Sequence, residues 1–449
     1  MKLHLNLSFS MIFLLSFFFS FNATAQQASA QATANAGGKA EWKGKFDKKK
    51  RKLGRWVYYS KSGTQLIVAN YVKGKLHGDY KSFYASGKKK QQSGYIDNLL
   101  SGNYEVFYNN KSNSPAVRGA YFAGLKSGIW SRWTLDNKLV STANYTKGLK
   151  NGIYTSFVNN TVYLTLAYKN GLLHGPARRY NIRNKKVIEQ GMYLNNQQQG
   201  VWKYWGSDGK LTKVANYNNG LLNNKLVRYN ENGHKWKVWS YNKGVLHGPY
   251  VEYFGSRKPR VYISGTYANN ERTGTWVYRY TSSKVWQRFS YKKDKIQGNY
   301  LQYYKSGRLW KITEYSDDKK HGKFIIYNDQ NIKRRLLTGH YLNNLQHGKW
   351  SYWYPDGKTI NKIVIYQNGV LHGISTQYYP SGRRWVKSHY KQDELNGGYF
   401  KFYNNPRGSI QLRGKYLNSS PVGTWTSWNP LGKIIKRKKY SQENSKENI

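Results

Sequence analysis

The sequence predicts an all-β protein, in which about sixteen tandem β-hairpin repeats of 23–26 residues form one elongated, twisted antiparallel sheet. Two observations predict this fold. A short motif centred on Gly recurs at a nearly constant spacing, and such a period is typical of a repeat array rather than of separate domains. The residues between its copies are aromatic and β-branched, with 42 Tyr and 16 Trp in 449 residues, and such residues favour strands.

The repeat is clearest in YNKGVLHGPYVEYF, which spans residues 241–254, and similar stretches cover 71–84 and 366–379. We take the Gly that follows His in this motif as the anchor of each unit. The sixteen anchors are Gly54, Gly78, Gly102, Gly128, Gly152, Gly175, Gly200, Asn224, Gly248, Gly274, Gly298, Gly322, Gly348, Gly373, Gly397 and Gly423.

Fixed offsets from the anchor predict the local structure of each unit. Tyr lies seven residues before every anchor except the first. In the same fifteen units Gly, Asn or Asp lies four residues before the anchor, with Ser419 as the exception, and these residues tolerate the positive φ of a tight turn. Aromatic residues recur two and five residues after the anchor, so they point to opposite faces of a regular strand. Each unit is therefore predicted to be turn, strand, turn, strand, with side chains packing between neighbouring strands.

The sequence also has a longer period of three units, because the aromatic residue two positions after the anchor is Trp in every third unit. The glycines that open these units, from Gly119 to Gly414, are 72–75 residues apart, which indicates a duplicated block of three hairpins. The regular Trp is either a relic of duplication or a ladder of binding residues. The six residues are Trp56, Trp130, Trp202, Trp276, Trp350 and Trp425.

The chain divides into four predicted segments. Residues 1–25 have the basic start, apolar core and Ala-x-Ala ending of a signal peptide. Residues 26–40 are small and polar, as in a flexible linker. Residues 41–440 form the repeat array, in blocks of about 74 residues, and residues 441–449 form a polar tail. We therefore expect an exported protein, periplasmic or extracellular, with no membrane span in the mature chain.

The charge predicts an anionic partner. Lys and Arg number 74 against 21 Asp and Glu, a formal net charge of +53, and a chain with this excess attracts anions. The basic residues are spread over all units. The densest run, which we consider a candidate binding segment together with the six Trp, is Lys48, Lys49, Lys50, Arg51 and Lys52.

The pattern YxNGxLHGxYxxYxxxG resembles the MORN repeat, and more closely its bacterial variant in the YwqK antitoxin-like family. The resemblance covers about residues 44–440. It implies a sheet in which each repeat contributes one hairpin, and a role in membrane-lipid recognition, protein interaction or dimerisation. The antitoxin function implied by the family name does not fit an exported protein.

The sequence shows no pattern of residues that indicates catalysis, and we expect neither a cofactor nor a bound metal. There is no Cys, and the Asp and Glu residues are few and irregularly placed. Histidines precede six anchors and could bind metal, but each unit supplies only one, about 10 Å from the next. The alternative is that they bond to the backbone of turns. These histidines are His77, His174, His247, His321, His347 and His372.

Two functions follow from these observations. The first is a non-enzymatic scaffold that mediates protein or surface interactions through a basic, aromatic-rich sheet. The second is a dedicated binder of a polyanion, which would be an anionic glycan, a lipid headgroup or a nucleic acid. An antitoxin or immunity role rests on the family name alone, and an enzyme is the least favoured class.

Overall fold

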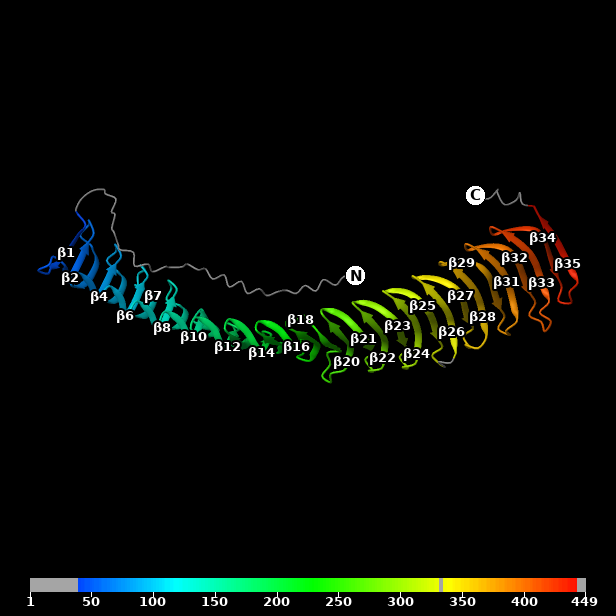
Figure 1. The fold of residues 1–449 in the computed structure, drawn as a ribbon, viewed down its shortest axis with the longest axis horizontal. Coiled ribbons are helices and arrows are strands. Elements are labelled where there is room, and N and C mark those ends of the chain that lie inside the picture. The colour runs from blue at the N-terminus through cyan, green and yellow to red at the C-terminus, as the bar shows by residue number, and fades with distance from the viewer. Residues whose placement is uncertain (1–38, 331–333, 442–449) are drawn as a thin grey trace.

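The computed structural model describes residues 39–330 and 334–441, and their regular structure is all strand (Figure 1). Strands β1 to β12 are Glu41–Phe46, Lys52–Tyr59, Gln65–Val72, Lys75–Phe83, Lys89–Ile96, Leu99–Phe107, Pro115–Phe122, Leu125–Trp133, Leu139–Thr146, Leu149–Val158, Thr161–Lys169 and Leu172–Tyr180. Strands β13 to β24 are Val187–Leu194, Gln197–Trp205, Leu211–Asn218, Leu221–Tyr229, Lys235–Asn242, Val245–Leu246, Gly248–Tyr253, Val261–Ala268, Glu271–Arg279, Val285–Lys292, Lys295–Tyr303 and Leu309–Ser316. Strands β25 to β35 are Lys319–Tyr327, Arg335–Leu342, Leu345–Trp353, Ile360–Gln367, Val370–Leu371, Gly373–Tyr378, Arg384–Lys391, Glu394–Phe402, Ile410–Leu417, Ser420–Trp428 and Ile434–Tyr440.

The strands form one open antiparallel sheet in chain order. β1 pairs with β2, β2 with β3, and the same step continues to β35 at the far end. β18 and β19 both pair with β17, and β29 and β30 both pair with β28, so each of these two pairs is a single strand interrupted at a His. Figure 1 shows the result as a long, bowed ribbon with β1 and β35 at opposite ends. The predicted single-sheet fold is confirmed.

The two long edges of the sheet differ in their turns. The tight-turn edge carries two-residue turns in which both residues have positive φ, for example 50° at Lys73 and 82° at Gly74. This is the type I′ geometry that suits the twist of a hairpin. The tight turn predicted four residues before each anchor is confirmed, and Ser419 also has a positive φ, of 61°. The opposite, long-turn edge carries mostly longer turns, such as residues 304–308.

The anchor residue lies inside a strand, where it forms a β-bulge. All sixteen anchors have positive φ, including Asn224 at 71°, which explains why Gly prevails there. In the hairpin of β20 and β21, Ser264 pairs with Val277 and Thr266 pairs with Thr273, so Gly265 alone faces three residues. We predicted that the strand is regular, and this prediction is wrong at the anchor, where the strand has a bulge. The bulge bends the strand, and Figure 1 shows the strands curving across the width of the ribbon.

The curvature gives the sheet an inner face, and the hydrophobic core lies there. Trp276 packs with Tyr250, Phe289 and Tyr291 in one cluster, and Trp350 packs with Phe324 and Val364 in another. Ring centroids of neighbouring units are close, at 5.5 Å between Tyr250 and Trp276. The predicted packing of side chains between neighbouring strands is confirmed.

Hydrogen bonds between successive turns fix each unit to the next. On the tight-turn edge, the N–H of Gly74 donates to the carbonyl of Lys52 at 2.9 Å, and Asn98 Oδ1 accepts from the N–H of Leu76 at 2.7 Å. On the long-turn edge, the Tyr304 hydroxyl donates to the carbonyl of Tyr327 at 2.9 Å. The signal peptide at 1–25, the linker at 26–40 apart from residues 39 and 40, and the tail after residue 441 lie outside the described residues.

Candidate functional site

The six Trp of the three-hairpin blocks lie in the interior. Their exposed fractions range from 1 % at Trp350 to 8 % at Trp425. Each ring covers the Gly that opens its own hairpin, as Trp202 covers Gly191, and a Cβ on that Gly would overlap the face of the ring. This burial leaves no free ring face for stacking on a ligand. The binding role predicted for these residues therefore has no support in their geometry. The Gly–Trp contact gives a structural reason why Gly and Trp recur together in every third unit.

The basic run of residues 48–52 divides into four exposed residues and one half-buried residue, Lys52. Lys48, Lys49, Lys50 and Arg51 are exposed in the turn between β1 and β2, a five-residue turn on the tight-turn edge, where Asp47 accepts from the Arg51 side chain at 2.8 Å. Lys52 instead turns inward. Its Nζ lies 4.3, 4.7 and 4.9 Å from the ring centroids of Trp42, Trp56 and Tyr71. Burial lowers the pKa of Lys52, so this residue belongs to the packing and only four residues of the run remain available to a ligand.

Basic residues elsewhere take the same inward position, two residues before the anchor. The Nζ of Lys126 lies 4.3 Å from the Trp130 ring, and the Nζ of Lys150 lies 4.7 Å from the Tyr154 ring. Burial lowers the pKa of both lysines. Part of the positive charge is therefore structural, and the surface charge must be sought at the two edges and on the outer face.

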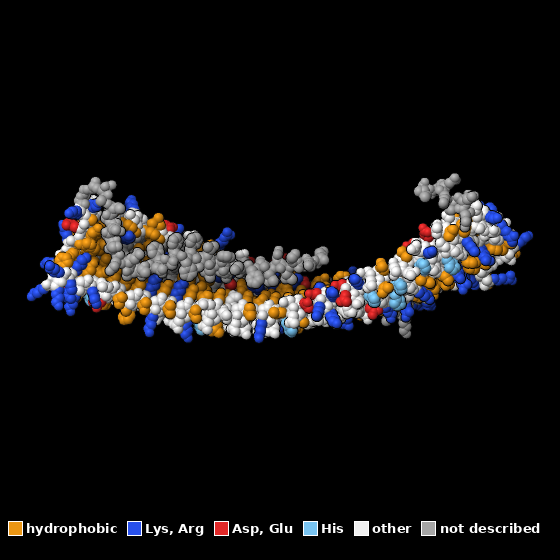
Figure 2. Space-filling model, turned by 45° about the horizontal axis from the view of Figure 1, so that its top comes forward, with side chains coloured by type: hydrophobic (Ala, Val, Ile, Leu, Met, Phe, Trp, Pro, Cys, Tyr) orange, Lys and Arg blue, Asp and Glu red, His pale blue; other side chains and the backbone are white. Residues whose placement is uncertain are grey.

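The long-turn edge carries a row of basic side chains. Lys or Arg ends or nearly ends the long turn in most units, and these side chains reach along the array toward the next turn. Lys284 Nζ donates to the carbonyl of Ser306 at 2.8 Å, and Arg308 Nη1 donates to that of Asp329 at 2.7 Å. Figure 2 shows Lys and Arg along the whole length of the molecule. The row comprises Lys88, Lys138, Lys186, Lys210, Arg260, Lys284, Arg308, Arg334, Lys358, Arg383 and Lys433.

Partly exposed aromatic rings accompany this row in the C-terminal half. The residue at the start of a long turn and the second residue of the following strand form a tilted pair. Centroid distances are 4.9 Å for Phe254–Tyr262, 6.2 Å for Tyr280–Trp286, 5.8 Å for Tyr304–Trp310 and 5.7 Å for Tyr379–Trp385. Our sequence reasoning missed these rings. The recurring Tyr, basic residue and Trp of YTSSKVW, YKSGRLW and YPSGRRW could have revealed them.

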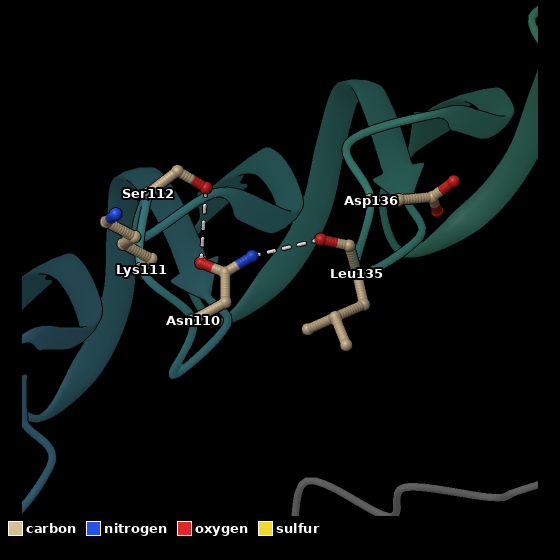
Figure 3. Close-up of a pocket in the computed structure, with 5 residues that line it drawn as sticks. All are labelled: Asn110, Lys111, Ser112, Leu135 and Asp136. Carbon is tan, nitrogen blue, oxygen red and sulfur yellow. Dashed lines mark hydrogen bonds between the residues drawn. The ribbon is translucent and has the colours of Figure 1, made fainter.

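Neighbouring long turns also leave shallow hollows between them. The clearest, of about 640 Å³, lies between the turns at 108–114 and 134–138 (Figure 3). Asn110 spans it, because its Nδ2 donates to the carbonyl of Leu135 at 2.9 Å. Lys111 and Asp136 stand at its rim, and the Thr134 hydroxyl and Lys138 lower the pKa of Asp136 to about 2. The hollow is open to solvent, and most of its surface is apolar although four of its five lining residues are polar.

The histidines before the anchors lie apart from one another. His77 Nδ1 is 3.7 Å from Asp97, and His174 Nδ1 is 3.3 Å from Asn195 Oδ1, so both face the side chain of the next tight turn. Among residues 39–330 and 334–441, no three His, Asp or Glu residues come together as metal ligands would. Within the same ranges there is no helix long and apolar enough to cross a bilayer.

Comparison with known proteins bears on the repeat. Residues 76–97, 198–219, 346–368 and 371–392 match the family model described as the MORN repeat variant. Each match covers about one unit, at positions spread along the array. They do not distinguish the YwqK-like group. No curated protein sequence matches the chain.

Solved structures show only a distant similarity. The chain is similar to the TcdB2–TccC3–Cdc42 complex with 12 % identity over 86 % of this chain and 26 % of that chain, at a TM-score of 0.14. The Photorhabdus luminescens Tc holotoxin pore has 11 % identity over 90 % of this chain and 28 % of that chain, at a TM-score of 0.14. The TcdB2–TccC3 structure has 12 % identity over 91 % of this chain and 25 % of that chain, at a TM-score of 0.15. The chain spans about a quarter of the length of these chains, and TM-scores of this size do not establish a common fold.

Proposed function

We propose, from the premise that this chain is a MORN repeat protein, that it is an exported, non-enzymatic scaffold whose basic surface holds an anionic partner. The observation that carries the proposal is the basic row, which continues from Lys88 to Lys433 along one edge of an unbroken sheet. A repeated charge at a fixed interval suits an extended partner better than a small molecule. Many weak contacts in series then give high affinity through multivalency.

Two kinds of partner would use this surface differently. A protein partner would add apolar contacts and would stay bound when salt screens the charges. A polyanion would depend on counterion release, so its affinity would fall steeply with salt. The charge excess of +53 favours the polyanion, and exposed apolar residues such as Phe122 and Ile129 favour the protein.

A pull-down from the exported fraction tests the proposal. The mature protein is immobilised and washed with increasing salt, and bound material is identified at each step. Release that follows ionic strength would support a polyanion, whereas a protein retained at high salt would support a protein scaffold. Absence of any bound material at low salt would contradict both.

Export is tested separately, by N-terminal sequencing of the protein recovered from cells. Cleavage after Ala25 predicts that the mature chain begins at Gln26. A chain that retains Met1 and stays in the cytoplasm would contradict the exported role.

A further inference from the structure

We propose that four consecutive long turns, at residues 230–234, 254–260, 280–284 and 304–308, form a binding site for a linear anionic polysaccharide. The inference rests on the proposed function, and it adds the site and the class of ligand. Each of these turns is followed by one partly exposed ring, and the last three turns end in Lys or Arg at equivalent positions, where the first ends in His234. The rings are Trp236, Tyr262, Trp286 and Trp310, and the basic residues that end the last three turns are Arg260, Lys284 and Arg308.

The four turns are rich in positive charge. They contain six Lys or Arg and a single carboxylate, Glu231. The basic side chains are held in place, because Arg260 Nη1 donates to the carbonyl of Thr281 at 2.7 Å and Lys284 and Arg308 make the same kind of bond. Each uses only part of its donor capacity in this way, so N–H groups remain for a ligand.

The rings are ordered by the same turns. Tyr280 and Tyr304 lie at 42° and 45° to Trp286 and Trp310, and their hydroxyls donate to the carbonyls of Tyr303 and Tyr327. Each Tyr therefore packs against its Trp, and both indoles remain partly exposed. Trp236 is 38 % exposed. A pyranose ring presents a C–H face that packs on such a partly exposed indole.

The spacing of the rings and basic side chains along the edge indicates the class of ligand. One unit is two strands wide, so rings and cations repeat about every 10 Å along the edge. A polysaccharide with one acidic group per disaccharide repeats at a similar interval. A nucleic acid carries one phosphate about every 3.4 Å along a stacked strand, so most of its charges would find no cation here.

Matched variants separate this site from general charge attraction. The site variant is Arg260→Gln, Lys284→Gln and Arg308→Gln. The control variant is Lys147→Gln, Lys243→Gln and Lys293→Gln, which removes the same charge from the tight-turn edge. Those three lysines are exposed with φ of 47–50°, and Gln392 occupies the equivalent position at 52°, so Gln is tolerated there. The ring variant is Trp286→Leu and Trp310→Leu, since Leu66 and Leu336 fill that position in other units.

Calorimetric titration of a hyaluronan decasaccharide, which carries one carboxylate per disaccharide, at about 100 mM salt is the test, with a single-stranded oligothymidylate of equal charge in parallel. We expect the site variant to lose about tenfold in affinity and the control variant no more than about twofold. The ring variant, whose charge is unchanged, should lose about fivefold. Equal losses in the two charge variants, with no loss in the ring variant, would overturn the site and leave the proposed function intact.

The remaining outcomes are equally decisive. Tighter binding of the oligothymidylate that depends on the same residues would overturn the ligand class. Failure of the wild-type chain to bind either polymer at about 50 mM salt would overturn the polyanion form of the proposed function as well. Far-ultraviolet circular dichroism of every variant confirms that the sheet is retained.

Discussion

The ring of Trp276 lies directly over Gly265. A Cβ added to Gly265 would come within 2.2 Å of Trp276 Cδ2, and the same contact recurs at Gly191–Trp202 and Gly339–Trp350. The bulge at Gly274 brings about this contact, because it sets Gly265 alone opposite three residues. Gly and Trp are therefore required together in every third unit.

Gly265→Ala should destabilise the array by roughly 1–3 kcal/mol, because the new methyl overlaps the indole and forces it from its place. The measurement is chemical denaturation of the variant and the wild type. The double variant Gly265→Ala, Trp276→Tyr should recover most of the loss. The chain itself shows that this pair fits, since Ala69 and Tyr80, and Ala143 and Tyr154, occupy the equivalent positions. An unchanged stability in the single variant would show that the Gly–Trp contact is not needed.

Removal of residues 191–264 should leave a folded, shorter protein. The deletion takes out one three-hairpin block and joins residue 190 to Gly265, so the next Gly–Trp pair stays in register. Stability in a repeat array is roughly a sum of local terms, which predicts cooperative unfolding with a smaller dependence on denaturant. Removal of half a hairpin is the matched control, and it should prevent folding because it reverses the strand direction at the joint. If the in-register deletion unfolds instead, a globular core must exist.

The stability of the protein should fall as the pH rises from about 10 to about 12. Burial raises the pKa of Tyr80, Tyr278 and Tyr352 to about 12, whereas an unfolded Tyr has a pKa near 10. A folded-state pKa above the unfolded one stabilises the fold fully below about pH 10, and that stabilisation is lost through this window. Denaturation midpoints at pH 8, 10 and 11.5, with near-ultraviolet absorbance of tyrosinate, measure it. Full tyrosinate formation at about pH 10.5 without loss of structure would contradict the burial.

Small-angle scattering should show a strongly elongated particle. The 35 strands make a sheet 33 strands wide, since β18 with β19 and β29 with β30 are each one interrupted strand. At about 4.8 Å per strand the sheet would extend to roughly 160 Å, and twist and bowing shorten it somewhat. The distance distribution should therefore have a long tail, and the cross-section of the particle should be no wider than one strand of eight or nine residues. A radius of gyration close to that of a compact sphere of 52.4 kDa would contradict the single sheet.

Most of the fold could be predicted from the sequence, because fixed offsets from the anchor carry the information. The Tyr, the turn residue and the anchor recur in nearly every unit, so an error in one unit would not change the predicted fold. The bulge could not be predicted with the same ease. Gly at an anchor such as Gly274 is equally consistent with a turn, and only strand pairing shows that it lies within a strand.

The candidate site was predicted less well, because exposure cannot be read from residue type. We predicted binding residues from the Trp that recurs in every third unit, such as Trp276, which is only 3 % exposed. The same reasoning missed Trp310, which lies at the long-turn edge. Lys52 was grouped with its exposed neighbours, although the strand that begins there turns its side chain inward. Both errors arise from the curl of the sheet, which decides which aromatic rows are enclosed.

The dependence of affinity on salt and on the number of blocks tests the central claim most directly. Full-length protein and variants that lack one or two three-hairpin blocks are titrated with an anionic polymer at about 50 and about 300 mM salt. We predict that affinity falls steeply with salt and falls stepwise with each block removed, because the contacts act in series. An affinity that responds to neither salt nor block number would contradict a distributed basic surface and would indicate one discrete site for a specific partner.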